Sequence, residues 1–328
     1  MKEALLKVLV CPKCKGPLDS KPTETAEDGN VLAGVLVCDP CGAEYSVSNG
    51  IPRFVEPDNY ATSFGYQWNL FRKEQIDSFN GTTLSADRFW SETGWDREQM
   101  SGKLVLDVGC GAGRFLDISS TADADVVGVD ISGAVDAAKA NLADRQNVHL
   151  VQASIYELPF REGTFDLAYC IGVVQHTPDT RQTLASIAEM VKPGGNIAVT
   201  IYPRKPWTKL YSKYWLRPVT KRMQKESLLK LIQAVMPVVF PITNVLFRVP
   251  KLSRVFQFMI PVANYVHEKQ LSRGQRYSWA ILDTFDMLSP AFDQPMTESE
   301  AREPLVAGGI EIDRVTDAGI NLAGKKLA

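Results

Sequence analysis

The sequence predicts an α/β protein with a mostly parallel sheet, a small cysteine-rich module at its N-terminus and a helical insertion near its C-terminus. Strand and helix patterns alternate from residue 103 to residue 202, and two Cys-x-x-Cys pairs stand within the first 41 residues. A basic stretch broken by prolines follows, at about residues 203–296. Alternating strands and helices form parallel sheets with right-handed crossovers. With 328 residues, the chain can hold one large domain and a small module.

We therefore expect three parts: the module at 1–57, an aromatic-rich connector at 58–100 and the large domain at 101–328. An apolar content of 45% and a charged content of 23% are typical of soluble globular proteins. The first residues are too charged for a signal peptide, and no run of about 18 uncharged apolar residues predicts a membrane span. We predict a cytoplasmic protein, with contact to the inner face of a membrane left open.

The cysteine pairs of the module predict a zinc site. Cys11 and Cys14 form one knuckle, and Cys38 and Cys41 form the other. Four thiolates close a tetrahedral shell around Zn²⁺ and leave no open position, so the metal is expected to be structural. A redox pair is the alternative, but it needs only one such knuckle. The stretches CPKCKGPL and CDPCGAEYSVSNGIPRFV resemble the zinc ribbon of the tRNA-methyltransferase-activator type.

A glycine-rich loop opens the large domain. The apolar strand 104–108 carries Asp107 and leads into Gly109, Gly111 and Gly113, and a helix pattern follows. Glycines at alternate positions let the backbone turn sharply and approach a ligand closely. An ordinary strand–turn–helix is the alternative interpretation. The stretch LDVGCGAGRF, which includes Cys110, resembles motif I of the class I S-adenosylmethionine (SAM)-dependent methyltransferases.

An acid ends the second strand of this domain, which is expected at 124–129. Asp130 stands about 20 residues after the loop, where a carboxylate can accept hydrogen bonds from the ribose hydroxyls of a nucleoside. Its alternative role is an acid at a helix N-terminus. Ile131 follows and is expected to lie against the adenine face.

Further segments resemble the same superfamily. The stretch QASIYELPF resembles the adenine-side loop, with Ser154 where an acid is usual and with the Ile155 N–H facing a ring nitrogen. The stretch CIGVVQH resembles the motif after the fourth strand, which implies that Cys170 and Ile171 face the methionine part of SAM. The resemblance implies a Rossmann-like sheet of seven strands. Its last hairpin, after a helix opened by the capping pattern of Thr297 and Glu300, adds an antiparallel strand.

The residue that removes a proton from the acceptor is less well defined. His176 follows the strand nearest the expected methyl group and is the best-placed candidate base, although this histidine is commonly structural in the superfamily. Asp283 and Asp286 stand where the acceptor pocket is expected to open. Cys110 and Cys170 are expected to be small buried residues and not nucleophiles.

The insertion is strongly basic. Residues 201–282 hold 15 Lys and Arg but only Glu226 and Glu268 as acids, while the whole chain has a net charge of −2. Three interpretations stay open: a helical lid on the core, a surface for an anionic membrane or lipid-linked acceptor, and an RNA surface. In the connector, Tyr66, Gln67 and Trp68 either cover the cofactor pocket or pack between module and core.

Three functions are consistent with these patterns. The first is a SAM-dependent methyltransferase that acts on an O or C atom of a small molecule, a glycan or a lipid-linked intermediate. The second is an RNA methyltransferase that uses the ribbon and the insertion to bind RNA. The third is a non-catalytic subunit with this fold that stabilises a partner. The glycine loop and Asp130 favour the first two over the third.

Overall fold

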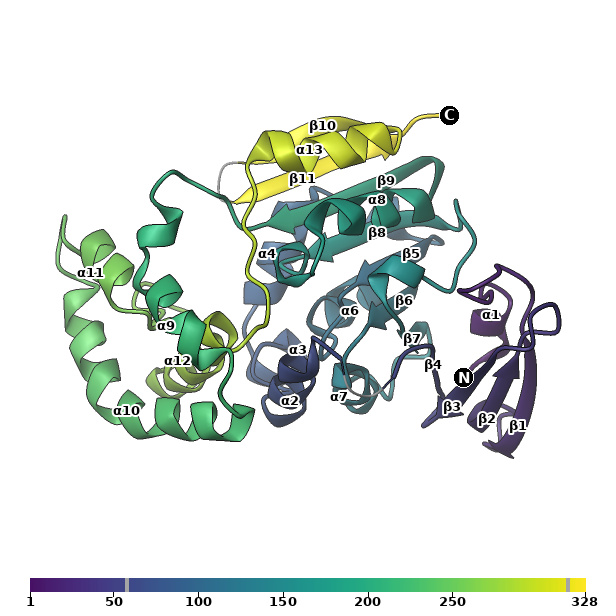
Figure 1. Cartoon of the computed structure of the whole chain (residues 1–328), viewed down its shortest axis with the longest axis horizontal. Helices are drawn as coiled ribbons and strands as arrows, with labels where there is room; N and C mark the ends of the chain where they lie inside the picture. Colours follow the sequence, from purple (N-terminus) through teal and green to yellow (C-terminus); the bar gives the residue numbers. More distant parts are fainter. Residues whose placement is uncertain (57–58, 317–318) are drawn as a thin grey trace.

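One continuous sheet runs through the molecule. The computed structural model describes residues 1–56, 59–316 and 319–328; the expected boundary between module and connector, at residues 57–58, lies outside these ranges. Within them, eleven strands form one sheet in the order β1-β2-β3-β4-β7-β6-β5-β8-β9-β11-β10 (Figure 1). Seven of these strands belong to the large domain, as predicted. The sheet is larger than predicted because the four strands of the module extend its edge.

The large domain has the predicted mostly parallel arrangement. Its strands are β5 (Leu104–Val108), β6 (Asp125–Asp130), β7 (Val148–Gln152), β8 (Phe165–Ile171), β9 (Val191–Ile201), β10 (Ile310–Thr316) and β11 (Ile320–Lys326). The first five pair in parallel, and β11 runs antiparallel to both β9 and β10. The predicted final antiparallel strand is therefore confirmed.

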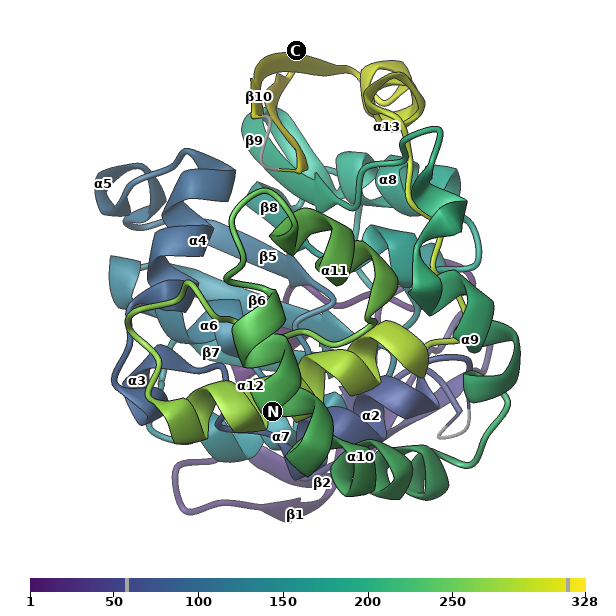
Figure 2. The same cartoon turned by 90° about the vertical axis from the view of Figure 1, so that its left-hand side faces the viewer.

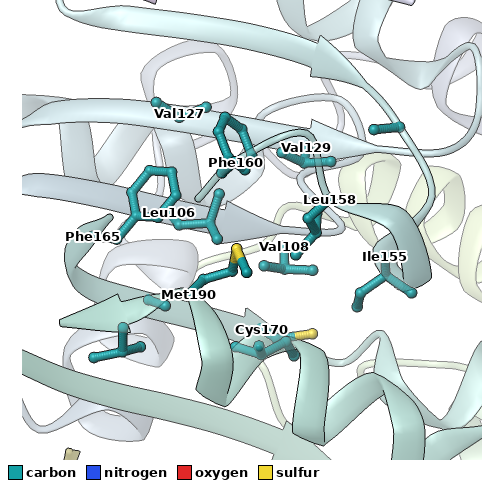
Figure 3. Packing of buried hydrophobic residues seen from close by; sticks show 14 of the residues in the cluster. Leu106, Val108, Val127, Val129, Ile155, Leu158, Phe160, Phe165, Cys170 and Met190 are labelled. Carbon is teal, nitrogen blue, oxygen red and sulfur yellow. The ribbon is translucent and has the colours of Figure 1, made fainter. Parts of the chain in front are cut away.

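Apolar side chains of these strands alternate between the two faces of the sheet. Leu106 and Val108 face one cluster with α8 and α13, whereas Val105 faces a second cluster with α4, α6 and α7. Figure 3 shows part of the first cluster, with Cys170 among its buried side chains. Helices therefore cover both faces, as a parallel sheet requires. The helices around the sheet are α6 (Arg114–Ser119), α7 (Ala134–Asn141), α8 (Thr180–Met190) and α13 (Glu298–Ala307).

Local sequence signals fix several of these elements. Thr297 Oγ1 accepts a hydrogen bond from the Glu300 N–H, and a Glu300 carboxylate oxygen accepts one from the Thr297 N–H, which completes the predicted capping box. The segment Lys192-Pro-Gly-Gly195 has a composition typical of a turn but lies inside β9. Its residues bulge opposite Asp166, and the Lys192 ammonium lies 2.9 Å from that carboxylate.

The module joins the sheet through its last strand. Its elements are α1 (Glu3–Leu6), β1 (Asp19–Thr25), β2 (Val31–Val37), β3 (Glu44–Ser48) and β4 (Ile51–Arg53). Strand β4 pairs in parallel with β7, and the Phe54 N–H donates to the Gln152 carbonyl at 2.8 Å. Arg53 donates to the Gln152 side chain and to Asp136, both at 2.7 Å. Because Gln152 in turn donates to the carbonyl of Ile131, the module supports the loop that carries Asp130.

The insertion lies beyond the carboxyl ends of the central strands, at the end of the molecule opposite the module, and the connector lies between the insertion and the sheet, with one of its helices packed on the sheet (Figure 1). The connector helices are α2 (Thr62–Leu70), α3 (Asp77–Asn80), α4 (Leu84–Thr93) and α5 (Arg97–Met100). The insertion helices are α9 (Ser212–Thr220), α10 (Lys225–Leu246), α11 (Ser253–Met259) and α12 (Arg273–Leu288). Helices α10 and α12 share a third apolar cluster, which is separate from the two clusters on the sheet.

Helix α10 differs from the sequence prediction in one respect. Among the described residues, α10 is the one helix that is long and apolar enough to cross a membrane, judged by length and composition alone. The mean hydropathy of its most apolar stretch is 1.6. About a third of its most apolar stretch (33%) is buried inside the protein, on the face toward α12. This helix is therefore part of a packed helical layer.

Candidate functional site

A large cavity opens where the central strands end. It has a volume of about 450 Å³ and is lined by the residues that follow β5, β6 and β8, together with residues of the connector and the insertion. In open α/β sheets, ligands bind at the carboxyl ends of the strands. The volume lies within the usual range for small-molecule pockets.

The glycine loop forms one wall of this cavity. Gly109 has a φ of +82°, and a Cβ atom there would lie 2.5 Å from Val173. Gly111 has a φ of +52°, and its position faces Trp68, which lines the same cavity. The Gly111 N–H donates to Asp130 Oδ2 at 3.0 Å. This hydrogen bond joins the glycine loop directly to the acid at the end of β6, 19 residues later in the sequence.

Asp130 takes part in the turn that leads into α7 and also borders the cavity. Its Oδ1 accepts from the N–H and the hydroxyl of Ser132, at 2.8 and 2.7 Å, just before α7. The carboxylate nevertheless lines the cavity, and burial raises its pKa above the usual value. A carboxylate offers about four acceptor positions; Oδ1 already accepts two hydrogen bonds, whereas Oδ2 accepts only the one from the Gly111 N–H. Acceptor capacity therefore remains for a ligand in the cavity.

The structure places the other expected cofactor residues in two groups. Gly109, Cys110, Ile131, Ile155 and Ile171 line the cavity with Gly111 and Asp130. The four that do not line it are Asp107, Gly113, Ser154 and Cys170.

Of these four, Asp107 and Cys170 are buried, Ser154 is half-buried, and Gly113 directly precedes α6. Asp107 is buried beneath the loop, its Oδ2 has no partner among the described residues, and burial raises its pKa well above the usual value. Ser154 Oγ accepts from the Tyr156 N–H and caps the turn at Ile155–Glu157. The thiols of Cys110 and Cys170 are buried, which raises their pKa values and disfavours the thiolate.

We expect Gly111→Val to weaken the binding of S-adenosylhomocysteine by more than about tenfold, because the new side chain would meet Trp68 and enter the cavity. Calorimetric titration measures the affinity. Gly102→Val is the matched control: Gly102 also has a positive φ, +67°, but nothing lies within 4 Å of its Cβ position. Equal losses in the two variants would show that backbone strain, and not the cavity, causes the effect.

The opposite wall of the cavity is polar and comes mostly from the insertion. Asp283 and Asp286 project from α12, and Lys213 projects from α9. Gln75 donates to Asp283 at 2.9 Å, and Gln67 donates to Asp286 at 3.4 Å. Tyr265 also donates to Asp283. The two acids that the sequence singled out therefore lie together in the same cavity as the glycine loop.

Burial raises the pKa of both Asp283 and Asp286 to about 6, with hydrogen bonds from Tyr265 and Gln67 acting in the opposite direction. An unfolded aspartate titrates near 3.9. Between these values the folded chain retains protons that the unfolded chain has lost. The contribution of these two groups to the free energy of unfolding therefore falls as the pH rises from about 4 to about 6. At higher pH it stays at this lower value.

We expect Asp286→Asn to stabilise the fold by about 1–3 kcal/mol above pH 7, and by little below pH 4, because the amide carries no charge to bury. Urea unfolding at both pH values measures the difference. Asp313→Asn, at an exposed position on β10, is the control and should show no such pH dependence. A stability of the Asp286→Asn variant below that of the unaltered chain at pH 8 would contradict this account.

His176 lines the cavity between the two walls. Its Nδ1 lies 3.1 Å from the Phe292 carbonyl, which can only accept, so Nδ1 carries the proton. Its Nε2 is buried and has no partner among the described residues. The ring packs against Phe64 and Tyr202, and burial lowers its pKa to about 4. The imidazole is thus neutral at pH 7 and presents a free lone pair.

Several cavity residues were not predicted from the sequence. Tyr60, Ala61 and Phe64 come from the connector, in addition to Trp68, and the cationic Arg88 and Arg114 also line the cavity. Arg114 donates to Ser85 and Gln75 at 2.9 and 2.7 Å. Its place directly after Gly113 is the one signal that could have identified it. Of the connector residues that were predicted to cover the pocket, Trp68 lines it, Gln67 holds Asp286, and Tyr66 packs near Phe285.

The four module cysteines form a second site, far from the cavity. Their sulfur atoms all lie within 4.8 Å of one another, and the nearest pairs are 3.3 and 3.7 Å apart. In a tetrahedral shell with Zn–S bonds of about 2.3 Å, the sulfurs are about 3.8 Å apart. The four thiols therefore fit a structural zinc ion with no open position.

Comparisons with known proteins agree with this division. Residues 106–199 match the family described as "Methyltransferase domain", and residues 2–50 match "Trm112p-like protein". Ubiquinone biosynthesis O-methyltransferases of Saccharophagus degradans and Aromatoleum aromaticum are 32% and 37% identical, over 133 and 101 residues. These matches cover 40% and 30% of this chain. The chain spans about half the length of these relatives, 56% and 43%.

Solved structures give broader but weaker matches. A complex between the Haloferax volcanii Trm112 methyltransferase activator and a methyltransferase matches 81% of this chain and 98% of its own, at 14% identity and a TM-score of 0.44. An O-methyltransferase family protein from Burkholderia thailandensis matches 77% of this chain and 59% of its own, at 13% identity and a TM-score of 0.45.

Proposed function

We propose that this chain, which carries a Trm112p-like domain followed by a methyltransferase domain, is a SAM-dependent methyltransferase that acts on a hydroxyl oxygen or an acidic carbon of a small molecule. One observation carries the proposal: one cavity is lined by the glycine loop and Asp130 on one wall, by two carboxylates on the opposite wall, and by His176 between them. The names of the curated relatives favour O-methylation.

The proposed cofactor site fits SAM in shape and in chemistry. Gly109 and Gly111 leave room that a Cβ atom would fill, and Asp130 retains acceptor capacity for the ribose hydroxyls. Ile131 and Ile155 supply apolar surface for the adenine, and Asp107 is buried behind the loop, outside the cavity lining. When bound, SAM supplies an activated methyl group on a sulfonium.

The protein's main task in this reaction is positioning. The acceptor atom must lie in line with the methyl carbon, and holding both in one cavity supplies much of the acceleration. His176 is proposed to take the proton from the acceptor, because its Nε2 is free and the Phe292 carbonyl fixes the ring. Asp286, whose hydrogen bond from Gln67 is long, can accept a hydrogen bond from an acceptor hydroxyl.

The module is proposed to act as a built-in support and not as a substrate-binding domain. It lies at the far edge of the sheet from the acceptor wall (Figure 1). Its Arg53 and the paired Gln152 hold the Ile131 carbonyl, next to Asp130. Zinc would therefore influence the cofactor site through the fold of the module.

Transfer of a labelled methyl group from SAM into fractionated cytoplasmic extract tests the proposal. We expect label in the small-molecule, glycan or lipid-linked fractions. Label in RNA would favour the second candidate, which the basic insertion supports. A folded, zinc-loaded chain that binds no SAM would instead support a non-catalytic role.

A further inference from the structure

An apolar stripe runs along the exposed side of α10 from Leu231 to Val245. Leu231, Val235, Val238, Ile242 and Val245 follow one another at alternating spacings of four and three residues, so they form one stripe along the helix. Each is exposed, and Val238 and Val245 are 63% and 64% exposed. We call these five residues the α10 stripe. Exposed apolar patches of this kind mark interaction sites in folded proteins.

The other side of α10 is already occupied. Leu229, Ile232, Met236 and Phe240 are buried and pack in one cluster with Phe285 of α12. A helix that is apolar on all sides belongs inside a protein core or in contact with lipid. Because the inner side is held by α12, α10 can lie on a membrane but cannot cross it without breaking this cluster.

Neighbouring helices of the insertion also expose apolar side chains. Figure 2 shows α9, α10 and α11 on the face of the molecule that is turned toward the viewer. On α9, Trp215 is 59% exposed, and Val219 is exposed beside it in the helix. On α11, Val255 and Met259 are exposed. Tryptophan is enriched where proteins meet the interfacial layer of a membrane.

Basic residues flank the α10 stripe at both ends. Lys230 stands directly before Leu231, and Arg248 follows Val245 by one helical turn, with Lys251 and Arg254 after it. All four are exposed, and none makes an ion pair in the described parts of the chain. Lysine and arginine near a membrane surface are attracted to anionic lipids, by about 1 kcal/mol each.

Charge and side-chain chemistry distinguish between three binding partners for this face: a second copy of the chain, RNA and an anionic bilayer. A second copy of the chain would place two strongly basic insertions against each other, which long-range repulsion opposes. RNA bases stack on aromatic rings, whereas the α10 stripe is entirely aliphatic. An anionic bilayer meets both features, because its headgroups match the basic residues and its acyl chains match the stripe.

We infer that this face docks on an anionic lipid bilayer and that the acceptor is an amphiphile held in that bilayer. The acceptor part rests on the proposed function. Helix α12 packs under α10 and carries Asp283 and Asp286 into the cavity, and α9 contributes Lys213. The wall of the cavity that is expected to receive the acceptor is thus built by the helices that form and support the membrane-facing surface.

Co-sedimentation of the full zinc-loaded chain with vesicles tests this inference. We expect binding to vesicles that contain phosphatidylglycerol and none to pure phosphatidylcholine. Val238→Asp together with Val245→Asp should weaken binding by more than about tenfold. Lys251→Gln together with Arg254→Gln should weaken it by about tenfold or more. Val306→Asp is the matched control, because Val306 on α13 is 52% exposed but far from this face; it should bind like the unaltered chain.

Three outcomes would overturn the inference. The first is no binding to anionic vesicles, and the second is equal binding by all variants. The third is a chain that binds no vesicles but forms a dimer, which the double substitution Val238→Asp and Val245→Asp dissociates. Thermal unfolding and titration with S-adenosylhomocysteine on the same samples show whether each variant is folded. They also separate the two proposals. Nucleoside binding without vesicle binding contradicts the membrane surface alone, whereas vesicle binding without nucleoside binding contradicts the methyltransferase proposal.

Discussion

Removal of the metal from the four-cysteine site is expected to unfold the module and to destabilise the whole chain. Structural zinc contributes about 10–16 kcal/mol of apparent binding free energy in small zinc domains. Cys38→Ser removes a buried ligand and should therefore abolish both zinc binding and the fold of residues 1–56. Zinc content and circular dichroism measure the two effects.

The large domain should also lose stability in this variant, because the contacts of Arg53 and Phe54 with Gln152 go with the module. We expect its melting temperature to fall by about 5–10 °C, which corresponds to the loss of a few hydrogen bonds at the edge of the sheet. Lys13→Ala, an exposed change inside the first knuckle, is the control and should keep the metal. A metal-free chain with an intact module and a reversible disulfide would contradict a zinc site.

Replacement of the cavity histidine is expected to have the largest effect on the reaction. If His176 takes the acceptor proton, His176→Ala should lower kcat by about 10²–10⁴ and leave the affinity for SAM nearly unchanged. Because the pKa of His176 is lowered to about 4, the base stays unprotonated down to about pH 5. No loss of kcat from histidine protonation is thus expected between pH 8 and pH 6.

His149 is a matched control for this variant. It is also buried, and burial also lowers its pKa to about 4, but it lies between the module and the large domain, away from the cavity. His149→Ala should reduce stability and leave kcat of the folded enzyme unchanged. Equal kcat values for His176→Ala and the unaltered chain would show that His176 is structural, and Asp286 would then be the next candidate for the base.

The parts of the fold that were predicted from sequence are those with local causes. Strand β5 matches its predicted range, 104–108, since an apolar run bounded by turn residues fixes it. The capping box of Thr297 and Glu300 is a contact within one helical turn. The cysteine cluster was predictable because each knuckle places two sulfurs together, and only the meeting of the two knuckles depends on the fold.

The parts that were not predicted depend on contacts between distant residues. Nothing near Arg53 in sequence indicates that it reaches Asp136, 83 residues away, and so joins the module to the main sheet. The acceptor wall brings Gln75 from the connector to Asp283, 208 residues later. Such contacts are set by the packing of whole helices, to which no short sequence pattern corresponds.

The basic insertion shows an intermediate case. Its charge was evident from composition, but the sequence could not distinguish a lid from a membrane or RNA surface. The structure shows that α10 has one buried and one exposed apolar face, which sequence periodicity alone could not assign to inside and outside.

The central claim is that the glycine loop and Asp130 hold a SAM-type nucleoside in the main cavity. Calorimetric titration of the zinc-loaded chain with S-adenosylhomocysteine tests it most directly. Saturable binding of one nucleoside per chain is the expected result. A folded chain that releases no binding heat at any temperature tested, and that shows no rise in melting temperature with the nucleoside, would contradict the claim.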